Sequence, residues 1–214
     1  MSRVKLVQQS DLSEENKEFY DMVPTLLGRV PNFYKTLSNS PYLAMAFLPI
    51  NSAAQREWDG TDLSGKLKEL IVIKTSHTNG CKYCYAHNTA LGAAAGIGED
   101  HIKALSLNDF SDNDLFAEEE VLAIKWAEAV TNNTAAGNDD LFNQLKEKFT
   151  EKQIVEMTIL CAMFNMINRI NDSLDVDLEE QGEVNLIKKS LHLKSEAYGN
   201  YLEWFGKFWK RNIS

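Results

Sequence analysis

The chain has few cysteines and no excess of basic residues. Three cysteines in 214 residues are too few for the disulfide framework of a small secreted domain. The formal net charge of −9 argues against nucleic acid as a partner of the surface as a whole. No apolar run approaches the roughly 20 residues that span a bilayer. The N-terminal segment lacks the apolar stretch of a secretory signal, so we expect no such signal. We therefore expect a protein of the reducing cytoplasm that does not act in a membrane.

Proline is missing from all but the first 50 residues, where it occurs as Pro24, Pro31, Pro41 and Pro49. Its absence elsewhere permits long uninterrupted helices. Alternating β-branched runs, the usual signal for hairpins, are missing as well. Apolar spacing and cap residues instead predict an all-α protein. The expected helices cover residues 14–27, 31–37, 42–56, 63–78, 81–95, 100–105, 118–131, 139–149 and 151–174.

The segment 154–174 is apolar on almost every side of a helix. Such a helix has to be covered on every face, so we expect it at the centre of the fold or closed off by a neighbouring subunit. Its polar residues Asn165, Asn168 and Arg169 are expected to make structural contacts rather than to take part in catalysis. Cys161, on the same helix, is expected to be an inert core thiol.

An aromatic stripe marks the C-terminal part of the chain. Tyr201, Trp204, Phe205 and Phe208 fall on one face of a helix. A stripe of this kind suits a helix on a membrane surface or on a partner. Because nothing else in the sequence indicates a membrane, we expect it to pack on the core or on another subunit. The chain is accordingly divided into a helical domain, residues 1–180, and a C-terminal aromatic helical extension, residues 181–214.

The most informative segment is Glu69–His87. Cys81 and Cys84 are three residues apart, His87 follows three residues later, and Glu69 precedes Cys81 by twelve. Residues three apart share one face of a helix with Cβ atoms roughly 5–6 Å apart, so the two thiols could form a disulfide after a small adjustment. If the helices on either side of the turn at residues 79–80 are antiparallel, Glu69 lies near the second turn of the cysteine helix. A carboxylate, a histidine and a thiol would then form a proton relay to a nucleophile.

Other chemistries that use a cysteine pair fit less well. A thioredoxin-like site follows a strand in a βαβ unit, and covalent haem attachment needs a histidine directly after the second cysteine, where Tyr85 stands. A zinc site formed by His77, Cys81, Cys84 and His87 stays open as an alternative. Two inert cysteines are a further alternative, which the nearby glutamate and histidine make less favourable than redox chemistry.

At this point the sequence resembles a known family. Glu-x11-Cys-x2-Cys followed by a histidine is similar to the alkylhydroperoxidase D-like branch of the carboxymuconolactone decarboxylase family. The segments Val30–Tyr34, with Pro41 after it, and Phe164–Arg169 are similar too. The resemblance covers roughly residues 10–180 and is strongest at 66–97. It implies an all-helical protein that assembles into homo-oligomers, often trimers or hexamers.

The resemblance also implies a role for each residue of the motif. Cys84 would attack a hydroperoxide, and Cys81 would resolve the sulfenic acid into a disulfide. Glu69 and a histidine would relay the proton, and an external dithiol or thiol carrier would reduce the disulfide without any bound cofactor. The decarboxylase branch usually lacks the cysteine pair, which disfavours decarboxylation. A general disulfide reductase or a redox sensor is the alternative.

Two positions depart from the family pattern. Family peroxidases commonly place the relay histidine four residues after the second cysteine, where this chain has Asn88, and His87 stands one residue earlier. One residue is a rotation of about 100° around a helix. Tyr83 also stands where the best-studied pattern has a histidine. The choice of nucleophile is a further question, since the helix dipole favours Cys81 whereas the family favours Cys84.

Overall fold

A computed structural model describes residues 1–108, 110–111 and 114–212 of the chain. These residues contain helices and one isolated bridge between Glu57 and His192, but no strand. The all-α prediction is confirmed, and each predicted range corresponds to one of the helices α1 to α9 with ends that differ by at most two residues. The helices are α1 (Glu14–Leu27), α2 (Asn32–Leu37), α3 (Pro41–Gln55), α4 (Gly65–Asn79), α5 (Lys82–Ala94), α6 (Glu99–Ser106), α7 (Glu118–Thr131), α8 (Asp139–Lys148), α9 (Glu151–Leu174), α10 (Gln181–Val184) and α11 (Ser195–Asn212).

Helix α4 lies at the centre of the fold and packs on α5, α7 and α9. Every residue from Lys68 to Ser76 is buried. Its two buried lysines have polar partners: Lys68 Nζ donates to the Arg56 carbonyl at 2.6 Å, and Lys74 Nζ lies 3.0 Å from Glu128 Oε1. Because these charges break up the apolar pattern, the sequence does not mark α4 as the central helix.

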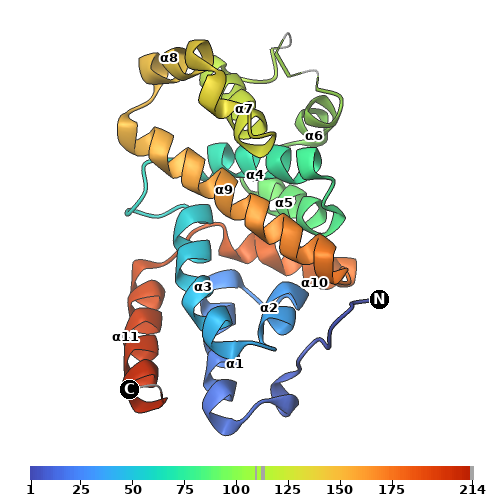
Figure 1. Ribbon diagram of the computed structural model, residues 1–214, viewed down its shortest axis with the longest axis vertical. Coiled ribbons are helices and arrows are strands. Elements are labelled where there is room, and N and C mark those ends of the chain that lie inside the picture. Colours follow the sequence, from blue (N-terminus) through green and yellow to red (C-terminus); the bar gives the residue numbers. More distant parts are fainter. Residues whose placement is uncertain (109, 112–113, 213–214) are drawn as a thin grey trace.

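Helix α9 is not the central helix. It crosses the outside of the fold as the long orange helix of Figure 1. Its residues Val155, Ile159 and Met166 are exposed, whereas Met157, Leu160 and Phe164 are buried. The apolar surface of α9 is therefore covered on one side by this chain and left uncovered on the other.

The turn between α4 and α5 places the cysteine pair. Ser64 begins α4 by accepting a hydrogen bond from the Leu67 N–H at 3.2 Å, and Gly80 ends it with a φ of 72°. Glycine adopts this left-handed conformation without the steric cost that a Cβ adds. The chain then turns directly into α5, with Cys81 as its N-cap residue.

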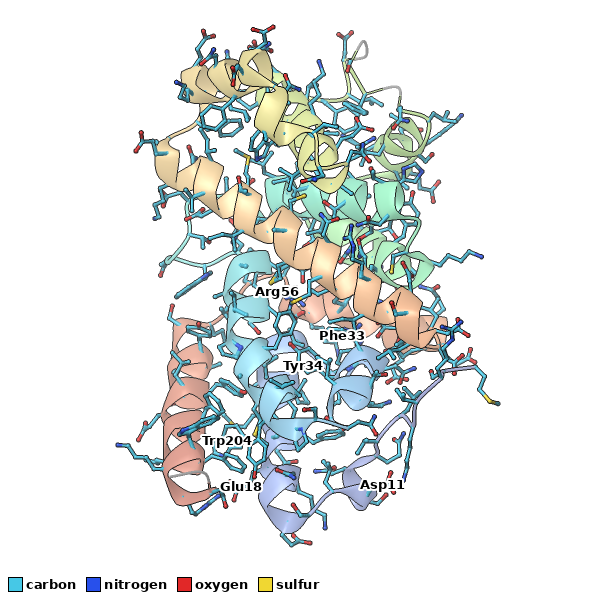
Figure 2. All side chains as sticks on the ribbon, in the orientation of Figure 1. Asp11, Glu18, Phe33, Tyr34, Arg56 and Trp204 are labelled. Carbon is cyan, nitrogen blue, oxygen red and sulfur yellow. The ribbon has the colours of Figure 1, made fainter. Side chains whose placement is uncertain are left out.

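The aromatic stripe of α11 packs on the core, as expected. In Figure 1 α11 runs beside α1 and α3, and Figure 2 labels Trp204 and Glu18 at this contact. Tyr201 is buried and donates from its hydroxyl to the Met45 carbonyl at 2.6 Å, and Trp204 Nε1 donates to Glu18 Oε2 at 2.8 Å. Residues 213–214 of the predicted extension lie outside the described residues. None of the described helices has the length and apolar character needed to cross a membrane.

The segment after α9 returns across α5. Its short 3-10 helix, Asn185–Ser190, packs on α5 and on α1. The approach to α1 is close at Gly28, where a Cβ atom would lie 3.0 Å from the Leu186 carbonyl oxygen and where φ is 76°. This return path brings Glu179 to His87, Ile187 to the cavity that Cys84 lines, and Ser190 to Arg56.

Candidate active site

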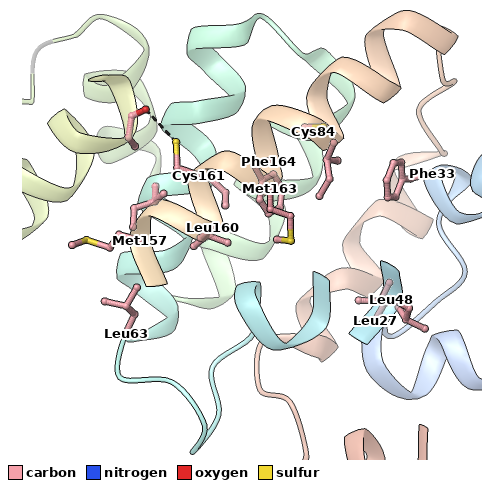
Figure 3. Close-up of a cluster of buried hydrophobic side chains, with 14 of the residues drawn as sticks. Leu27, Phe33, Leu48, Leu63, Cys84, Met157, Leu160, Cys161, Met163 and Phe164 are labelled. Atoms are coloured by element: carbon pink, nitrogen blue, oxygen red, sulfur yellow. Dashed lines mark hydrogen bonds between the residues drawn. The ribbon is translucent and has the colours of Figure 1, made fainter. Parts of the chain in front are cut away.

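Cys81 and Cys84 lie at the start of α5, Cys81 as the N-cap and Cys84 in the first turn. Both thiols are free, and their residues are 0% and 3% exposed. Cys84 lines a cavity of about 60 Å³, while Cys81 is not among its lining residues. Figure 3 shows Cys84 in one group of side chains with Phe33 and Phe164. Cys84 is therefore the thiol that a small molecule in this cavity would meet.

The cavity combines apolar walls with a few buried polar groups, as small-molecule sites do. It lies where α5, α9 and the N-terminal helices meet. Its lining residues are Leu27, Arg29, Pro31, Phe33, Tyr34, Asn51, Gln55, Arg56, Tyr83, Cys84, His87, Asn88, Phe164, Ile167 and Ile187.

The two thiols have different electrostatic environments. The pKa of Cys81 is raised, first by its side-chain hydrogen bond with Cys84 and then by burial. Cys81 therefore keeps its proton at neutral pH. Asn171 Nδ2 also donates to Cys84 Sγ, at 3.3 Å. The cavity position of Cys84 and the raised pKa of Cys81 thus favour Cys84 as the nucleophile, in contrast to the argument from the helix dipole alone.

His87 is directed to a carboxylate that the sequence motif does not contain. Its Nδ1 lies 2.9 Å from the Tyr83 carbonyl oxygen, and its Nε2 lies 3.0 Å from Glu179 Oε2 without hydrogen-bonding alignment. The imidazole also packs on the Tyr83 ring, with centroids 4.4 Å apart. Both ring nitrogens of His87 are thereby oriented by α5 and by the segment after α9.

Glu179 is the buried anion that organises this side of the site. Its Oε1 accepts from the Asn32 N–H and, at 2.9 Å, from the Tyr83 hydroxyl. Burial alone would raise the pKa of Glu179, but His87 and the Asn32 N–H outweigh burial and lower the pKa to about 2. Glu179 is therefore a carboxylate at neutral pH, held by groups from two separate helices, α2 and α5.

Glu69 is fully buried on α4 and belongs to a second polar group. Gln55 Nε2 donates both to Glu69 Oε1 at 3.1 Å and to Asn88 Oδ1 at 3.2 Å. Asn88 Nδ2 in turn donates to Ser76 Oγ at 3.1 Å. Burial raises the pKa of Glu69 to about 8, against the opposing effects of Arg56 and Gln55. At neutral pH, Glu69 is thus a neutral acid joined to the second turn of α5 through Gln55.

The four residues of the predicted site are gathered around α5, but they do not form one continuous relay. Among the residues that the structure describes, Glu69 and His87 share no hydrogen bond. Asn88, at the position where the family commonly has histidine, takes the side facing Gln55, and His87 turns toward Glu179. The rotation of one residue along the helix explains this division.

Sequence reasoning missed Gln55, Asn171 and Glu179. Each comes from another helix or from the segment after α9, and each acts through a contact far along the chain. No local motif announces such a residue. A buried glutamine, asparagine or glutamate needs a partner, but the sequence does not show which of these residues are buried.

A comparison with known families now bears on the site. The model of the carboxymuconolactone decarboxylase family matches residues 46–129, which run from α3 into α7 and include both cysteines of the pair. Residues 46–129 are thus similar to this family.

Two curated proteins are similar to part of the chain. The uncharacterized protein YdfG of Bacillus subtilis is 29% identical over 105 residues, which cover 49% of this chain and 70% of that protein. The uncharacterized protein YnjA of Escherichia coli is 26% identical over 110 residues, 51% of this chain and 59% of that protein. Neither name assigns an activity.

Solved structures show the fold over most of the chain. An alkylhydroperoxidase AhpD core, an uncharacterized peroxidase-related protein from Ralstonia eutropha, has a TM-score of 0.72 at 22% identity and covers 87% of this chain and 96% of its own. The debrominase Bmp8, as a cysteine-to-alanine variant in complex with 2,3,4-tribromopyrrole, has a TM-score of 0.70 at 24% identity and covers 87% and 98%. The chain therefore has an AhpD-like fold.

The four residues of the zinc alternative, His77, Cys81, Cys84 and His87, are not gathered into a metal site in the described part of the chain. No group of three or more His, Cys, Asp or Glu side chains is placed to hold a metal ion in the described part of the chain. His77 packs on the Tyr85 ring with centroids 5.9 Å apart, whereas His87 faces Glu179.

Cys161 lies apart from the pair, on the buried side of α9 where it meets α4 and α7. Its sulfur lies 3.3 Å from both Thr75 Oγ1 and the Ala127 carbonyl oxygen, the second contact being the dashed line in Figure 3. Burial raises the pKa of Cys161, against the effect of the hydroxyls of Thr131 and Thr75. A buried, protonated thiol reacts poorly, in keeping with the expectation of an inert core residue.

The buried acid Glu69 gives a prediction about stability and pH. Its pKa is about 8 in the fold against 4.5 in the unfolded chain. Between these pH values the unfolded chain has lost the proton of Glu69 and the folded chain keeps it. The free energy of unfolding therefore falls by about 1.4 kcal/mol for each unit by which the pH rises. Glu69→Gln removes this loss. As the pH rises from 5.5 to 7.5, we expect the free energy of unfolding of the variant, measured by urea denaturation, to increase by about 2–3 kcal/mol relative to that of the wild type.

The matched control is Glu119→Gln, at an exposed glutamate of α7. Its stability should follow that of the wild type at both pH values. A difference between Glu69→Gln and wild type that stays constant with pH would show that Glu69 is already ionised in the folded chain.

Proposed function

We propose that the chain is a thiol-dependent, peroxidase-like oxidoreductase that reduces hydroperoxides through a Cys81–Cys84 dithiol/disulfide cycle. The observation that carries this proposal is the position of Cys84. It lines the cavity, its sulfur accepts from Asn171, and the protonated Cys81 lies beside it.

The proposed cycle has two steps on the protein. The Cys84 thiolate attacks the terminal oxygen of the hydroperoxide, the O–O bond breaks, and the departing alkoxide takes a proton to give the alcohol. Cys84 is then a sulfenic acid. The Cys81 sulfur attacks the Cys84 sulfur, the sulfenic oxygen leaves as water with the Cys81 proton, and the disulfide forms.

Two groups near the cavity can supply protons. His87 lines the cavity with Cys84, so it is the group placed to protonate the departing alkoxide. Glu69 holds a proton at neutral pH and reaches the cavity wall through Gln55 and Asn88. In this proposal His87 acts at the substrate, and Glu69 serves as a proton reserve behind the wall.

The cycle needs an external dithiol or thiol carrier, which reduces the disulfide by exchange and is itself oxidised. The cytoplasm supplies such reductants, and we place the protein there. We further propose that the chain works as a homo-oligomer, as a trimer or a hexamer. The exposed apolar residues Val155, Ile159 and Met166 of α9 suit a subunit contact.

A second candidate is the thiol-dependent reduction of another small organic molecule. The burial of both thiols and the apolar cavity wall favour a small substrate over a disulfide on another protein. The debrominase Bmp8, which has a similar fold, was solved with a brominated pyrrole. A reaction of this type would use the same cysteine pair with a different leaving group.

Thiol counting tests the proposal. One equivalent of tert-butyl hydroperoxide added to the reduced chain should remove two of the three thiols. Peptide mapping should find Cys81 and Cys84 in one disulfide and Cys161 still free, and dithiothreitol should restore all three thiols. Unchanged thiols after peroxide addition, or a disulfide that includes Cys161, would contradict it.

A further inference from the structure

Two arginines line the same cavity as Cys84. Arg29 follows α1 and Arg56 ends α3, and their residues are 6% and 2% exposed. Figure 2 labels Arg56 with Phe33 and Tyr34, where α9 crosses the N-terminal helices. A guanidinium stays charged in proteins, and a buried charge is costly unless a partner compensates it. Two such groups on the wall of one small cavity therefore need an explanation.

Neither arginine has a full set of partners. Arg56 Nε donates to Ser190 Oγ at 3.2 Å, but the buried Nη1 of Arg56 and the buried Nε of Arg29 have no hydrogen-bond partner within the described residues. No described carboxylate lies within 4.0 Å of either guanidinium, since neither forms an ion pair. The donors are thus left available at the cavity.

The nearest acids compensate this charge only in part, and none of them forms an ion pair with either arginine. Glu69 acts on Arg56 from α4, but its pKa of about 8 leaves it uncharged at neutral pH. Glu179 and Glu183 act on Arg29 from a distance, and the hydrogen bonds of Glu179 go to Asn32 and Tyr83 rather than to Arg29. Burial lowers the pKa of Arg56 to about 10, and the charge of Arg29 is a further cause. The two guanidinium groups therefore remain charged and close enough to repel each other.

We propose that Arg29 and Arg56 form a subsite for the carboxylate of the substrate, which is a small organic acid that carries a hydroperoxide. The inference rests on the proposed function of Cys84, because it places the reacting group at that sulfur. Arginine forks match the two oxygens of a carboxylate, and the anion would relieve the repulsion between the two guanidinium groups. The apolar walls formed by Leu27, Phe33 and Ile167 fit the hydrocarbon body.

A binding experiment tests the subsite without the redox reaction. The full chain with Cys84→Ser is titrated calorimetrically with 3-hydroxy-3-methylbutanoate and with its neutral amide, which differ only in the charged group. We expect the acid to bind at least tenfold more tightly than the amide. We expect Arg29→Gln or Arg56→Gln to remove this preference and Arg29→Lys to keep part of it. Equal affinities for acid and amide, or no binding of the acid, would overturn the subsite even if an arginine variant failed to fold.

A kinetic experiment separates failure of the subsite from failure of the proposed function. The wild-type chain is given tert-butyl hydroperoxide and 3-hydroperoxy-3-methylbutanoate, its analogue with a carboxylate on one methyl group. We expect kcat/KM to be at least tenfold higher for the acid, mostly through KM. Equal reduction of both peroxides would overturn the subsite and leave the peroxidase proposal standing. Tight binding of the acid without reduction of either peroxide would do the reverse.

Discussion

Cys84→Ser is expected to lose peroxide consumption in a single turnover by about 10³-fold or more, because it lacks the attacking sulfur. Cys81→Ser should still consume one equivalent and then stop, because its Cys84 sulfenic acid has no thiol to resolve it. Peroxide loss is followed in a stopped-flow instrument, and a dimedone adduct identifies the sulfenic acid. The difference between the two variants follows from the cavity position of Cys84 and from the raised pKa of Cys81.

The matched control for these variants is Cys161→Ser. It removes a thiol of the same chain that lies in the core and not at the cavity. Its peroxide consumption should equal that of the wild type. If the Cys84→Ser protein consumed one equivalent while Cys81→Ser did not, the nucleophile would be Cys81, as the helix dipole alone suggests.

Glu179→Ala is expected to lower the free energy of unfolding by about 3–5 kcal/mol. The substitution leaves the Tyr83 hydroxyl, the Asn32 N–H and His87 without their buried anionic partner. Glu180→Ala is the matched control, because this neighbouring glutamate is exposed and should cost little. Chemical denaturation at neutral pH measures both. A loss below about 1 kcal/mol for Glu179→Ala would show that water replaces the carboxylate.

The carboxylate of Glu179 also makes the free energy of unfolding depend on pH in the acid range. Its pKa is about 2 in the fold against 4.5 in the unfolded chain. A lowered carboxyl pKa contributes stability that is fully present above pH 4.5 and is lost as the pH falls toward 2. The difference between wild type and Glu179→Ala should therefore shrink over this range. A difference that did not change with pH would assign the loss to packing rather than to charge.

Sequence patterns predicted the helices because each pattern is local. Spacing, caps and Gly80 fix where α4 and α5 begin and end without reference to the rest of the chain. The central position of α4 was not predictable in this way. Lys68 and Lys74 read as surface residues, and only the carbonyl of Arg56 and the carboxylate of Glu128 explain their burial.

The candidate site was predictable in its reactive groups but not in its connections. The spacing of Glu69, Cys81, Cys84 and His87 gathers them around α5, whereas the direction of each side chain depends on distant partners. His87 turns toward Glu179, which lies 92 positions further along the chain. Consecutive residues of a helix point in directions about 100° apart, so positions 87 and 88 face different neighbours. Such long-range choices are decided by packing, which a single sequence does not display.

The segment that returns over α5 after α9 has a consequence for how proteins with this fold can diversify. Cys81 and Cys84 lie within residues 46–129. Arg29, Phe33 and Ile187 come from outside that stretch and line the cavity, and Glu179 contacts His87. The cysteine pair is thus encoded in one stretch of the chain, whereas the cavity around it is built from that stretch and from both flanking segments. A descendant can exchange its flanks, keep its sulfur pair, and thereby acquire a new substrate without rebuilding its reactive centre.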